Sequence, residues 1–270
     1  MAAPVGSQEL ELAPPPPGFK SVNSQDGSID YSNPSALRAR LEARGIRLLV
    51  IRHGQSLSNE QSERLGVPLL YGQTESPLTA LGMEQAHRCG ATLYQELGGE
   101  AWARQCAADP QKLPVIISSS LERARQTSQA LVDDLRTHGV ELDYRTDDRL
   151  METNFGRFEG RPYGELESAY PDFVRSWRPS GGNGTNYAHR FPEGESRCDV
   201  MNRLMDMLSG VAEDYPGRTV VLVSHSECLI ALRAVLGLAP VEEGKLRAET
   251  RGNANATPYW LLPSPSAPIR

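Results

Sequence analysis

The chain has 270 residues, of which 39% are hydrophobic and 23% are charged, and its formal net charge at pH 7 is −6. These proportions are those of a globular chain that can bury a core. The negative charge argues against a nucleic-acid-binding surface. The longest apolar runs have the length of strands and fall short of a membrane span, so we expect neither nucleic acid nor a membrane as a partner.

The four cysteines show no close spacing along the chain: Cys89, Cys106, Cys198 and Cys228. Structural disulfides belong to oxidising compartments, so this pattern favours a reduced, cytoplasmic protein. Residues 1–34 contain four consecutive prolines and many Gly, Ser, Asn and Asp residues. They lack the positively charged start and the apolar centre of a signal peptide, and we expect a flexible extension without a core of its own.

A short helix is expected over residues 35–44, before a strand that contains the apolar run 48–51. Four apolar residues without alternation, two of them β-branched, are typical of a strand buried on both faces. The run stops at Arg52 and His53, and ligands of open α/β sheets bind at the carboxyl ends of strands. An imidazole beside a guanidinium can form an anion site with a nucleophile inside it, although a strand can also simply end in polar residues.

Residues 79–97 follow as a predicted helix, whose core face carries Met83, Ala86, Gly90, Leu93 and Leu97 at helical spacing. For these five residues, core packing is the expected role.

Residues 114–120 are predicted to form a buried strand that runs into serines, and a helix follows from Leu121. Serines before a helix suit an N-cap. Arg123 then lies in the first turn, where free backbone N–H groups favour an anion and an arginine gains little from the helix dipole. A bidentate phosphate clamp explains Arg123 better than a stabilising role does. Arg125 has no such argument and is expected at the surface.

Residues 140–144 and 257–262 are expected to form two further strands. The loop-like segment over residues 150–160 contains two acids, two aromatic residues and two glycines. Its local sequence leaves Glu152 open to two interpretations, a solvated loop acid or a functional group.

The last strong signals are an amphipathic helix over residues 195–215 and a strand over 219–224. His225 follows this strand directly, and an apolar helix over 229–236 leaves the sheet. Two of only five histidines therefore follow the two strongest strand signals, which favours a site. The elements together predict an α/β domain over residues 35–262, a three-layer α/β/α sandwich with a mostly parallel central sheet, and residues 263–270 form a tail.

Taken together, these segments resemble the histidine phosphatase superfamily, also called the phosphoglycerate mutase-like family, in its phosphatase branch. The resemblance covers about residues 46–237 and consists of an ordered series of motifs, which is far more specific than one Arg-His-Gly. The motifs are Arg52-His53-Gly54-Gln55-Ser56 closed by Asn59, Ser-Pro-Leu-Thr-x-x-Gly-x-x-Gln-Ala at 76–86, Ser-Ser-x-Leu-x-Arg-Ala-x-Gln-Thr at 118–127, Glu152 ahead of Phe-Gly-x-Phe-Glu-Gly at 155–160, Phe-Pro-x-Gly-Glu-Ser at 191–196 and Val-Ser-His at 223–225.

The resemblance implies that His53 attacks the phosphorus of a phosphomonoester and forms a phosphohistidine, which water later hydrolyses. It implies that Glu152 protonates the leaving oxygen and then activates the water. The residues that would hold the phosphoryl oxygens are Arg52, Asn59, Arg123 and His225. We expect no metal ion and no other cofactor, because arginines and imidazole supply the positive charge and the sequence has no zinc-site motif.

One position departs from the family pattern, which usually has glycine after the second histidine. This chain has Ser226 there. Its side chain adds bulk at the wall of the site, and its hydroxyl can contact phosphate, so we count it among the phosphate-binding residues. The departure is expected to affect rate and substrate preference more than the class of reaction.

The mutases of the family carry a longer insertion after the region that corresponds to Gly160. Here only about 30 residues separate Gly160 from Phe191, which favours a phosphatase acting on a small phosphorylated molecule. Two alternatives remain, a phosphoglycerate mutase-type phosphoryl transfer and a non-catalytic relative that binds a phospho-ligand or a protein. The segment 161–190 is expected to cap the site and select the substrate, and a homodimer is one assembly that we consider.

Overall fold

Among the described residues, five strands form one sheet in the order β3-β2-β4-β1-β5. The structure is a computed structural model that describes residues 34–172, 174, 190–238 and 255–262. Strand β1 pairs in parallel with β4, β4 with β2 and β2 with β3, while β5 runs antiparallel to β1 at one edge. The strands are β1 (Arg47–Arg52), β2 (Val115–Ser118), β3 (Tyr144–Thr146), β4 (Thr219–Ser224) and β5 (Pro258–Leu262).

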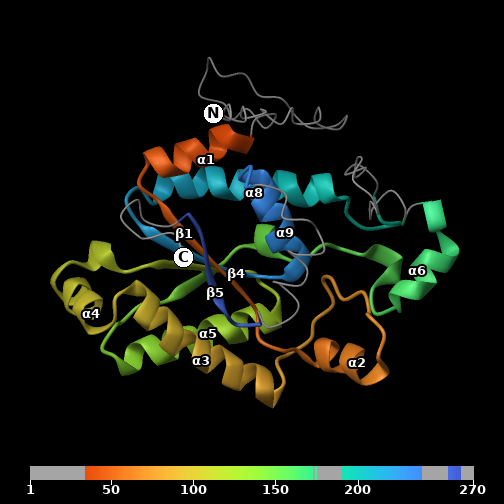
Figure 1. Ribbon diagram of the computed structural model, residues 1–270, viewed down its shortest axis with the longest axis horizontal. Coiled ribbons are helices and arrows are strands. Elements are labelled where there is room, and N and C mark those ends of the chain that lie inside the picture. Colours follow the sequence, from red (N-terminus) through yellow and green to blue (C-terminus); the bar gives the residue numbers. More distant parts are fainter. Residues whose placement is uncertain (1–33, 173, 175–189, 239–254, 263–270) are drawn as a thin grey trace, which may run out of the picture.

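Helices cover both faces of this sheet, and Figure 1 shows the resulting three layers. One face carries α1 (Pro34–Ala43), α8 (Arg197–Asp214) and α9 (Ser226–Val235). The other face carries α3 (Ala80–Leu97), α4 (Gly99–Ala108) and α5 (Glu122–Thr137). The predicted α/β/α sandwich with a mostly parallel sheet is confirmed.

The alternating side chains of β1 explain why both faces need a helical layer. Leu48 and Val50 belong to the core on the side of α8 and α9, and Leu49 and Ile51 belong to the core on the side of α3 and α5. Successive side chains of a strand point to opposite faces, so an unbroken apolar run serves two cores. Each of these four side chains is at most 4% exposed and contributes roughly 1.5–3 kcal/mol by leaving water.

Polar caps set the start of the two long helices. The Thr79 hydroxyl accepts the N–H of Gly82 at 3.0 Å and starts α3. Ser196 and Asp199 form a capping box at the start of α8. Such caps satisfy backbone donors that the helix itself leaves unpaired. The helices predicted over residues 79–97 and 195–215 are confirmed, and in the structure they are Ala80–Leu97 and Arg197–Asp214.

The strand predicted over residues 140–144 lies further along the chain, because the end of α5 occupies its start. Gly139 has a φ of 74°, and Val140 donates its N–H back to the Leu135 carbonyl at 3.1 Å, which closes the last turn of the helix. Val140 is buried in the core behind that turn, so its apolar character reflects packing. Strand β3 begins only at Tyr144, where it pairs with β2.

Two short helices that the sequence analysis does not predict, α2 (Leu57–Leu65) and α6 (Tyr163–Ala169), lie at one end of the molecule in Figure 1. A separate apolar cluster joins α6 to the loops around it. Its members are Leu70, Phe155, Phe158, Tyr163, Leu166, Val174 and Phe191. This cluster packs directly against the segment that follows Glu152 and so fixes that loop.

The extension predicted over residues 1–34 lies outside the described residues except for Pro34, which begins α1. The tail predicted over residues 263–270 and most of the expected cap over 161–190 also lie outside them. In the part of the chain that the structure describes, no helix is both long enough and apolar enough to span a membrane.

Candidate active site

The two histidines predicted at strand ends lie together at the carboxyl edge of the sheet. Strands β1 and β4 pair in register, with Arg52 beside Ser224, and the N–H of His53 donates to the Ser224 carbonyl at 3.0 Å. The ring centroids of His53 and His225 are 5.1 Å apart, and the rings are tilted by 53°. Parallel pairing of the two strands therefore produces the juxtaposition that the sequence pattern predicts.

The ring of His53 is held in a tautomer that suits a nucleophile. Its Nδ1 lies 2.7 Å from the Gly54 carbonyl oxygen, which can only accept, so Nδ1 carries the proton. The lone pair is then on Nε2. Burial, together with the positive charges of Arg123 and Arg52, holds the pKa of His53 well below its usual range, and the neutral ring can attack an electrophile.

Two glycines let the His53 loop lie directly against the start of α3. A Cβ atom on Gly54 would lie 2.3 Å from the carbonyl oxygen of Gly82, and one on Gly82 would lie 2.0 Å from that of Gln55. Both contacts are with backbone, which cannot swing aside. The N–H of Gly54 also donates to the Thr127 hydroxyl at 3.0 Å, so α3 and α5 together position the loop that follows His53.

His225 is fully buried, and both of its ring nitrogens have partners. Nδ1 accepts the Nε–H of Arg123 at 3.1 Å, because a guanidinium can only donate, and Nε2 therefore donates to the Ser119 hydroxyl at 2.8 Å. Burial and the charge of Arg123 hold the pKa of His225 well below its usual range. The ring of His225 orients Arg123. For His225 to contact a phosphoryl oxygen directly, its Nε2 would have to break the hydrogen bond with Ser119.

The serines before α5 do not cap that helix as the sequence analysis predicts. The N-cap position falls on Leu121, and the N–H of Glu122 donates to the Glu75 carboxylate at 2.7 Å instead. The reason is that Leu121 still has extended backbone, which leaves the serines before the first turn. Ser119 is left to bind His225.

Arg123 lies in the first turn of α5, as predicted, and is 2% exposed. Its guanidinium donates to the carbonyls of Thr74 at 3.0 Å and Gly72 at 2.6 Å, as well as to His225. Three of its five N–H groups are thus used to fix its plane, and two remain for a ligand. Burial lowers the pKa of Arg123, but a guanidinium stays charged at pH 7. Arg125 is exposed, as expected.

Glu152 is a buried acid in a loop that packs against the first turn of α9. Its interpretation as a solvated loop residue is therefore wrong. Its carboxyl group is hydrogen-bonded by the N–H groups of Thr153 at 2.8 Å and of Glu227 and Cys228 at 3.1 Å each. Burial raises the pKa of Glu152, and the carboxylate of Glu227 raises it further, against the opposing effect of the backbone donors and Arg123. A raised pKa favours the protonated form of the carboxyl group, which is the form that can donate a proton.

The sequence analysis did not identify the pair that holds the Glu152 loop. Arg203 of α8 donates to Glu195 at 2.9 and 3.2 Å and to the Glu152 carbonyl at 3.1 Å. Glu195 in turn accepts the N–H of Asn154 at 2.9 Å. One signal could have revealed this role, namely a charged residue on the core-facing side of a predicted helix. Arg203 lies three residues after Val200, which places it on that side.

A buried ion pair that was also not identified lies next to Glu152. Glu227 lines the cavity and contacts Arg197 at 3.1 Å, with the side chains 10% and 8% exposed. The positive charge of Arg197 makes the burial of Glu227 tolerable. No local sequence feature indicates this pair, because its members lie on different helices, α8 and α9.

Asn59 and Ser226 both face the site from the first turns of helices. The Asn59 side-chain oxygen accepts the N–H of Ser56 at 3.1 Å in a capping box at the start of α2, which leaves the NH₂ group as a donor. Ser226 begins α9, and its buried hydroxyl has no hydrogen-bond partner among the described residues. The Asn59 NH₂ group is thus available as a donor, whereas the Ser226 hydroxyl is buried beneath the cavity wall.

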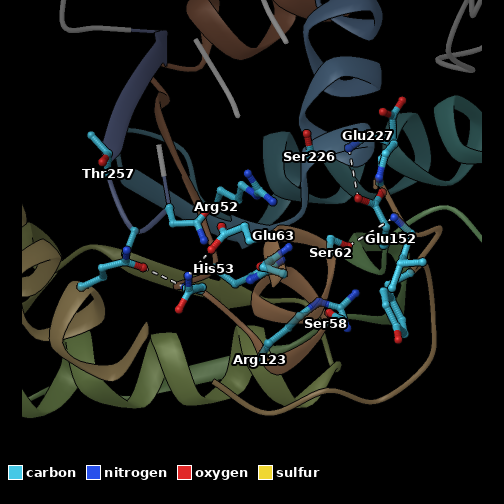
Figure 2. Close-up of a pocket in the computed structure, with 18 of the residues that line it drawn as sticks. Arg52, His53, Ser58, Ser62, Glu63, Arg123, Glu152, Ser226, Glu227 and Thr257 are labelled. Atoms are coloured by element: carbon cyan, nitrogen blue, oxygen red, sulfur yellow. Dashed lines mark hydrogen bonds between the residues drawn. The ribbon is translucent and has the colours of Figure 1, made fainter. Parts of the chain in front are cut away.

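A cavity of about 660 Å³ opens at this edge of the sheet, a size that suits a small molecule. Six of the seven predicted site residues line it: Arg52, His53, Asn59, Arg123, Glu152 and Ser226. The seventh, His225, lies behind them. Figure 2 shows Arg52 next to His53 at the end of β1, and Glu152 next to Glu227 at the start of α9. Across the described ranges, no cluster of three or more His, Cys, Asp or Glu side chains could hold a metal ion.

Comparison with known proteins identifies the family. The model of the histidine phosphatase superfamily (branch 1) matches residues 48–256. The chain belongs to this superfamily. Among its relatives, the probable phosphoglycerate mutase GpmB of Yersinia enterocolitica is 32% identical over 203 residues, which are 75% of this chain and 80% of that protein. The corresponding protein of Yersinia pestis shows the same identity and coverage.

Solved structures of the superfamily agree with the fold. The mycobacterial glucosyl-3-phosphoglycerate phosphatase in complex with inorganic phosphate is 28% identical, with a TM-score of 0.53, over 72% of this chain and 80% of that chain. A second structure, mycobacterial hydrolase 1, is 27% identical, with a TM-score of 0.55, over 79% of this chain and 87% of that one. Phosphatase and mutase names thus both occur among the similar proteins.

Proposed function

We propose that the protein is a phosphatase that hydrolyses the phosphomonoester of a small molecule through a phosphohistidine on His53. The observation that carries the proposal is the hydrogen bond from His53 Nδ1 to the Gly54 carbonyl at 2.7 Å. It leaves the lone pair on Nε2, and His53 lines the same cavity as the acid Glu152. A nucleophile and a proton donor in one cavity are what two-step phosphoryl transfer needs.

In the first step the lone pair of His53 Nε2 forms the N–P bond as the ester P–O bond breaks. Glu152, protonated at the start, gives its proton to the leaving oxygen and becomes a carboxylate. The raised pKa of Glu152 supports this role, because an ordinary glutamate would already be ionised at neutral pH. The alcohol product then departs, and the phosphoryl group stays on His53.

In the second step the Glu152 carboxylate takes a proton from a water molecule, whose oxygen attacks the phosphorus. The N–P bond breaks, the electron pair returns to Nε2, and inorganic phosphate is released. Glu152 is again protonated and His53 again neutral, so the cycle closes. One carboxyl group serves as acid and then as base, as the hydrolysis of a covalent intermediate requires.

Arg52 and Arg123 supply the positive charge around the transferred phosphoryl group. Both line the cavity, and the two donors that Arg123 retains can bind two phosphoryl oxygens side by side. The contact of Arg123 with His225 fixes the plane of the guanidinium. Phosphoryl transfer depends mainly on such positioning and charge stabilisation, so the reaction that we propose uses no metal ion or other cofactor.

A phosphoglycerate mutase reaction is the second candidate, and the similarity to the probable phosphoglycerate mutase of Yersinia enterocolitica favours it. The two reactions share the first step and differ in whether water or a second substrate hydroxyl accepts the phosphoryl group. The short interval between Gly160 and Phe191 supports hydrolysis. A cytoplasmic location, a homodimer and the absence of nucleic-acid partners remain predictions.

A panel of phosphate esters tests the proposed function. Release of inorganic phosphate and interconversion of 2- and 3-phosphoglycerate are measured on the same enzyme, with and without a chelator. We expect phosphate release at a rate that the chelator leaves unchanged. Interconversion that is faster than phosphate release would replace the phosphatase by the mutase, and loss of turnover with the chelator would contradict the metal-independent mechanism.

A further inference from the structure

A second cavity of about 420 Å³ lies at the opposite, amino end of the sheet. Arg47 and Thr219, which pair in register as the first residues of β1 and β4, both line it. Five residue steps separate Arg47 from Arg52, so this cavity lies ~17 Å from the active site along the strand. Helix α4 and the 3₁₀ turn Pro110–Lys112 form its other walls, and the proposed phosphatase reaction does not use it.

The cavity is positively charged, and its described lining contains no counter-ion. The guanidinium of Arg47 is half-buried, and among the described residues it has neither a hydrogen bond nor an ion pair. Burial lowers the pKa of Arg47, and no carboxylate opposes that shift. Lys112 is a second cation at the wall, and none of the described residues that line the cavity is acidic.

A buried hydroxyl at the same cavity also lacks a partner. Thr219 is 3% exposed, and within the described ranges its Oγ1 makes no hydrogen bond. A buried polar atom without a partner destabilises the folded state, and native proteins rarely tolerate one without a reason. A ligand that accepts a hydrogen bond from this hydroxyl would provide such a reason.

The start of α4 lies at the same cavity. Its N-cap, Gly98, has a φ of 116°, and no side chain caps the helix there. Gly98 and Ala101 both line the cavity. The N–H groups of an uncapped first turn, together with the helix dipole, favour an anion.

We propose that this cavity is a second binding site, for a small molecule that carries a phosphate group. Two cations match the charge of a phosphate monoester at neutral pH, and a planar guanidinium can bind two of its oxygens. The Thr219 hydroxyl and the first turn of α4 complete a set of donors around one anion. The site lies at the opposite end of the sheet from His53, so it binds its ligand whether or not the active site is occupied.

Trp102 lines the cavity, and its indole N–H donates to the Lys112 carbonyl at 3.4 Å. The NMR signal of this N–H therefore reports ligand binding at this site alone. Its NMR signal is assigned with Trp102→Phe and followed while inorganic phosphate replaces chloride at constant ionic strength. We expect a saturable shift in the wild type. Arg47→Gln should weaken the apparent affinity by about tenfold or more, because a charge-assisted hydrogen bond is lost.

Two further variants separate a binding role from a structural one. Thr219→Val removes the unpartnered hydroxyl, so it should keep or raise the unfolding temperature and still weaken the phosphate-dependent shift. Arg104→Gln is the matched control, because Arg104 lies on α4, pairs with Glu100 and is 68% exposed outside the cavity. It removes the same charge and should leave the shift unchanged.

An absent shift in the wild type would overturn the proposal, and so would equal shifts in the wild type and Thr219→Val. If Arg47→Gln and Arg104→Gln weaken the affinity for phosphate equally, the binding reflects the general positive charge of the surface, which would also overturn the proposal. If Arg47→Gln does not fold, Thr219→Val decides the question alone. Hydrolysis of phosphate esters should be unchanged in all of these variants, so the outcome does not depend on the proposed function.

Discussion

Strands β1 and β4 lie side by side and each ends in a histidine, yet the two imidazoles are held in opposite ways. His53 donates through Nδ1 to a carbonyl of its own loop and keeps the lone pair of Nε2. His225 uses both nitrogens within the protein, on Arg123 and Ser119. The same sequence pattern therefore yields one ring that keeps a lone pair, which we propose as the nucleophile, and one ring that orients Arg123.

Replacing the nucleophile should have the largest effect. His53→Ala removes Nε2 and leaves the rest of the cavity intact, so we expect turnover to fall by about 10⁵-fold or more with little change in the unfolding temperature. Steady-state kinetics and thermal unfolding measure the two quantities. Substantial residual turnover would mean that the two histidines have been assigned to the wrong roles.

Glu152→Gln tests the proposed proton donor and should have the next largest effect. For esters with basic leaving groups, we expect the rate of hydrolysis to fall by about 10²–10⁴-fold. An activated aryl phosphate should lose much less, because its leaving oxygen needs no proton. Activity of the wild type should fall as the pH rises through the raised pKa of Glu152, since the protonated form is the active one. That alkaline limb should be absent in the variant.

Glu63→Gln is the matched control for Glu152, because Glu63 is another acid that lines the cavity, and among the described residues its carboxylate accepts a hydrogen bond only from the Gln55 amide. It should show neither the dependence on the leaving group nor the loss of the alkaline limb. Equal losses across leaving groups in Glu152→Gln would make Glu152 a structural residue.

His225→Ala addresses the support directly. It leaves the buried Nε–H of Arg123 without an acceptor, so we expect a loss of about 10²-fold in kcat while the phosphohistidine still forms. Ser119→Ala removes only the other partner of the ring and should cost less. Complete loss of the phosphohistidine in His225→Ala would show that both histidines take part in the first step.

The smallest effect is expected at Ser226, beside His225. Ser226→Gly removes a hydroxyl that has no partner among the described residues, so phosphatase activity should stay within about tenfold and the ranking of substrates should change. The panel of esters measures both. Loss of catalysis would make the hydroxyl an essential group, and an unchanged ranking would place Ser226 outside the determinants of specificity.

The sequence predicts the part of the fold and the site that rests on local patterns. The apolar runs of β1 and β4 place His53 and His225 at one edge of the sheet, because parallel pairing brings strand ends together. The position of Arg123 follows in the same way from helix α5. Such features depend on residues that lie next to each other in the chain.

The rest depends on contacts between distant segments, which no local pattern contains. The raised pKa of Glu152 arises from its burial at the first turn of α9. The support from Arg203 and the orientation of Arg123 by His225 are also contacts across the fold. Likewise, the sequence predicts Val140 as a strand residue, whereas in the structure it follows α5 and packs in the core behind the last turn of that helix.

The most direct test of the central claim is to locate the phosphoryl group in the trapped intermediate. The enzyme is mixed with substrate, quenched in denaturing alkali within one turnover, digested and mapped by mass spectrometry. We predict an acid-labile, alkali-stable phosphoryl group on the peptide that contains His53, still present in His225→Ala and absent in His53→Ala. A phosphoryl group on any other residue, or its persistence in His53→Ala, would contradict the assignment of His53 as the nucleophile.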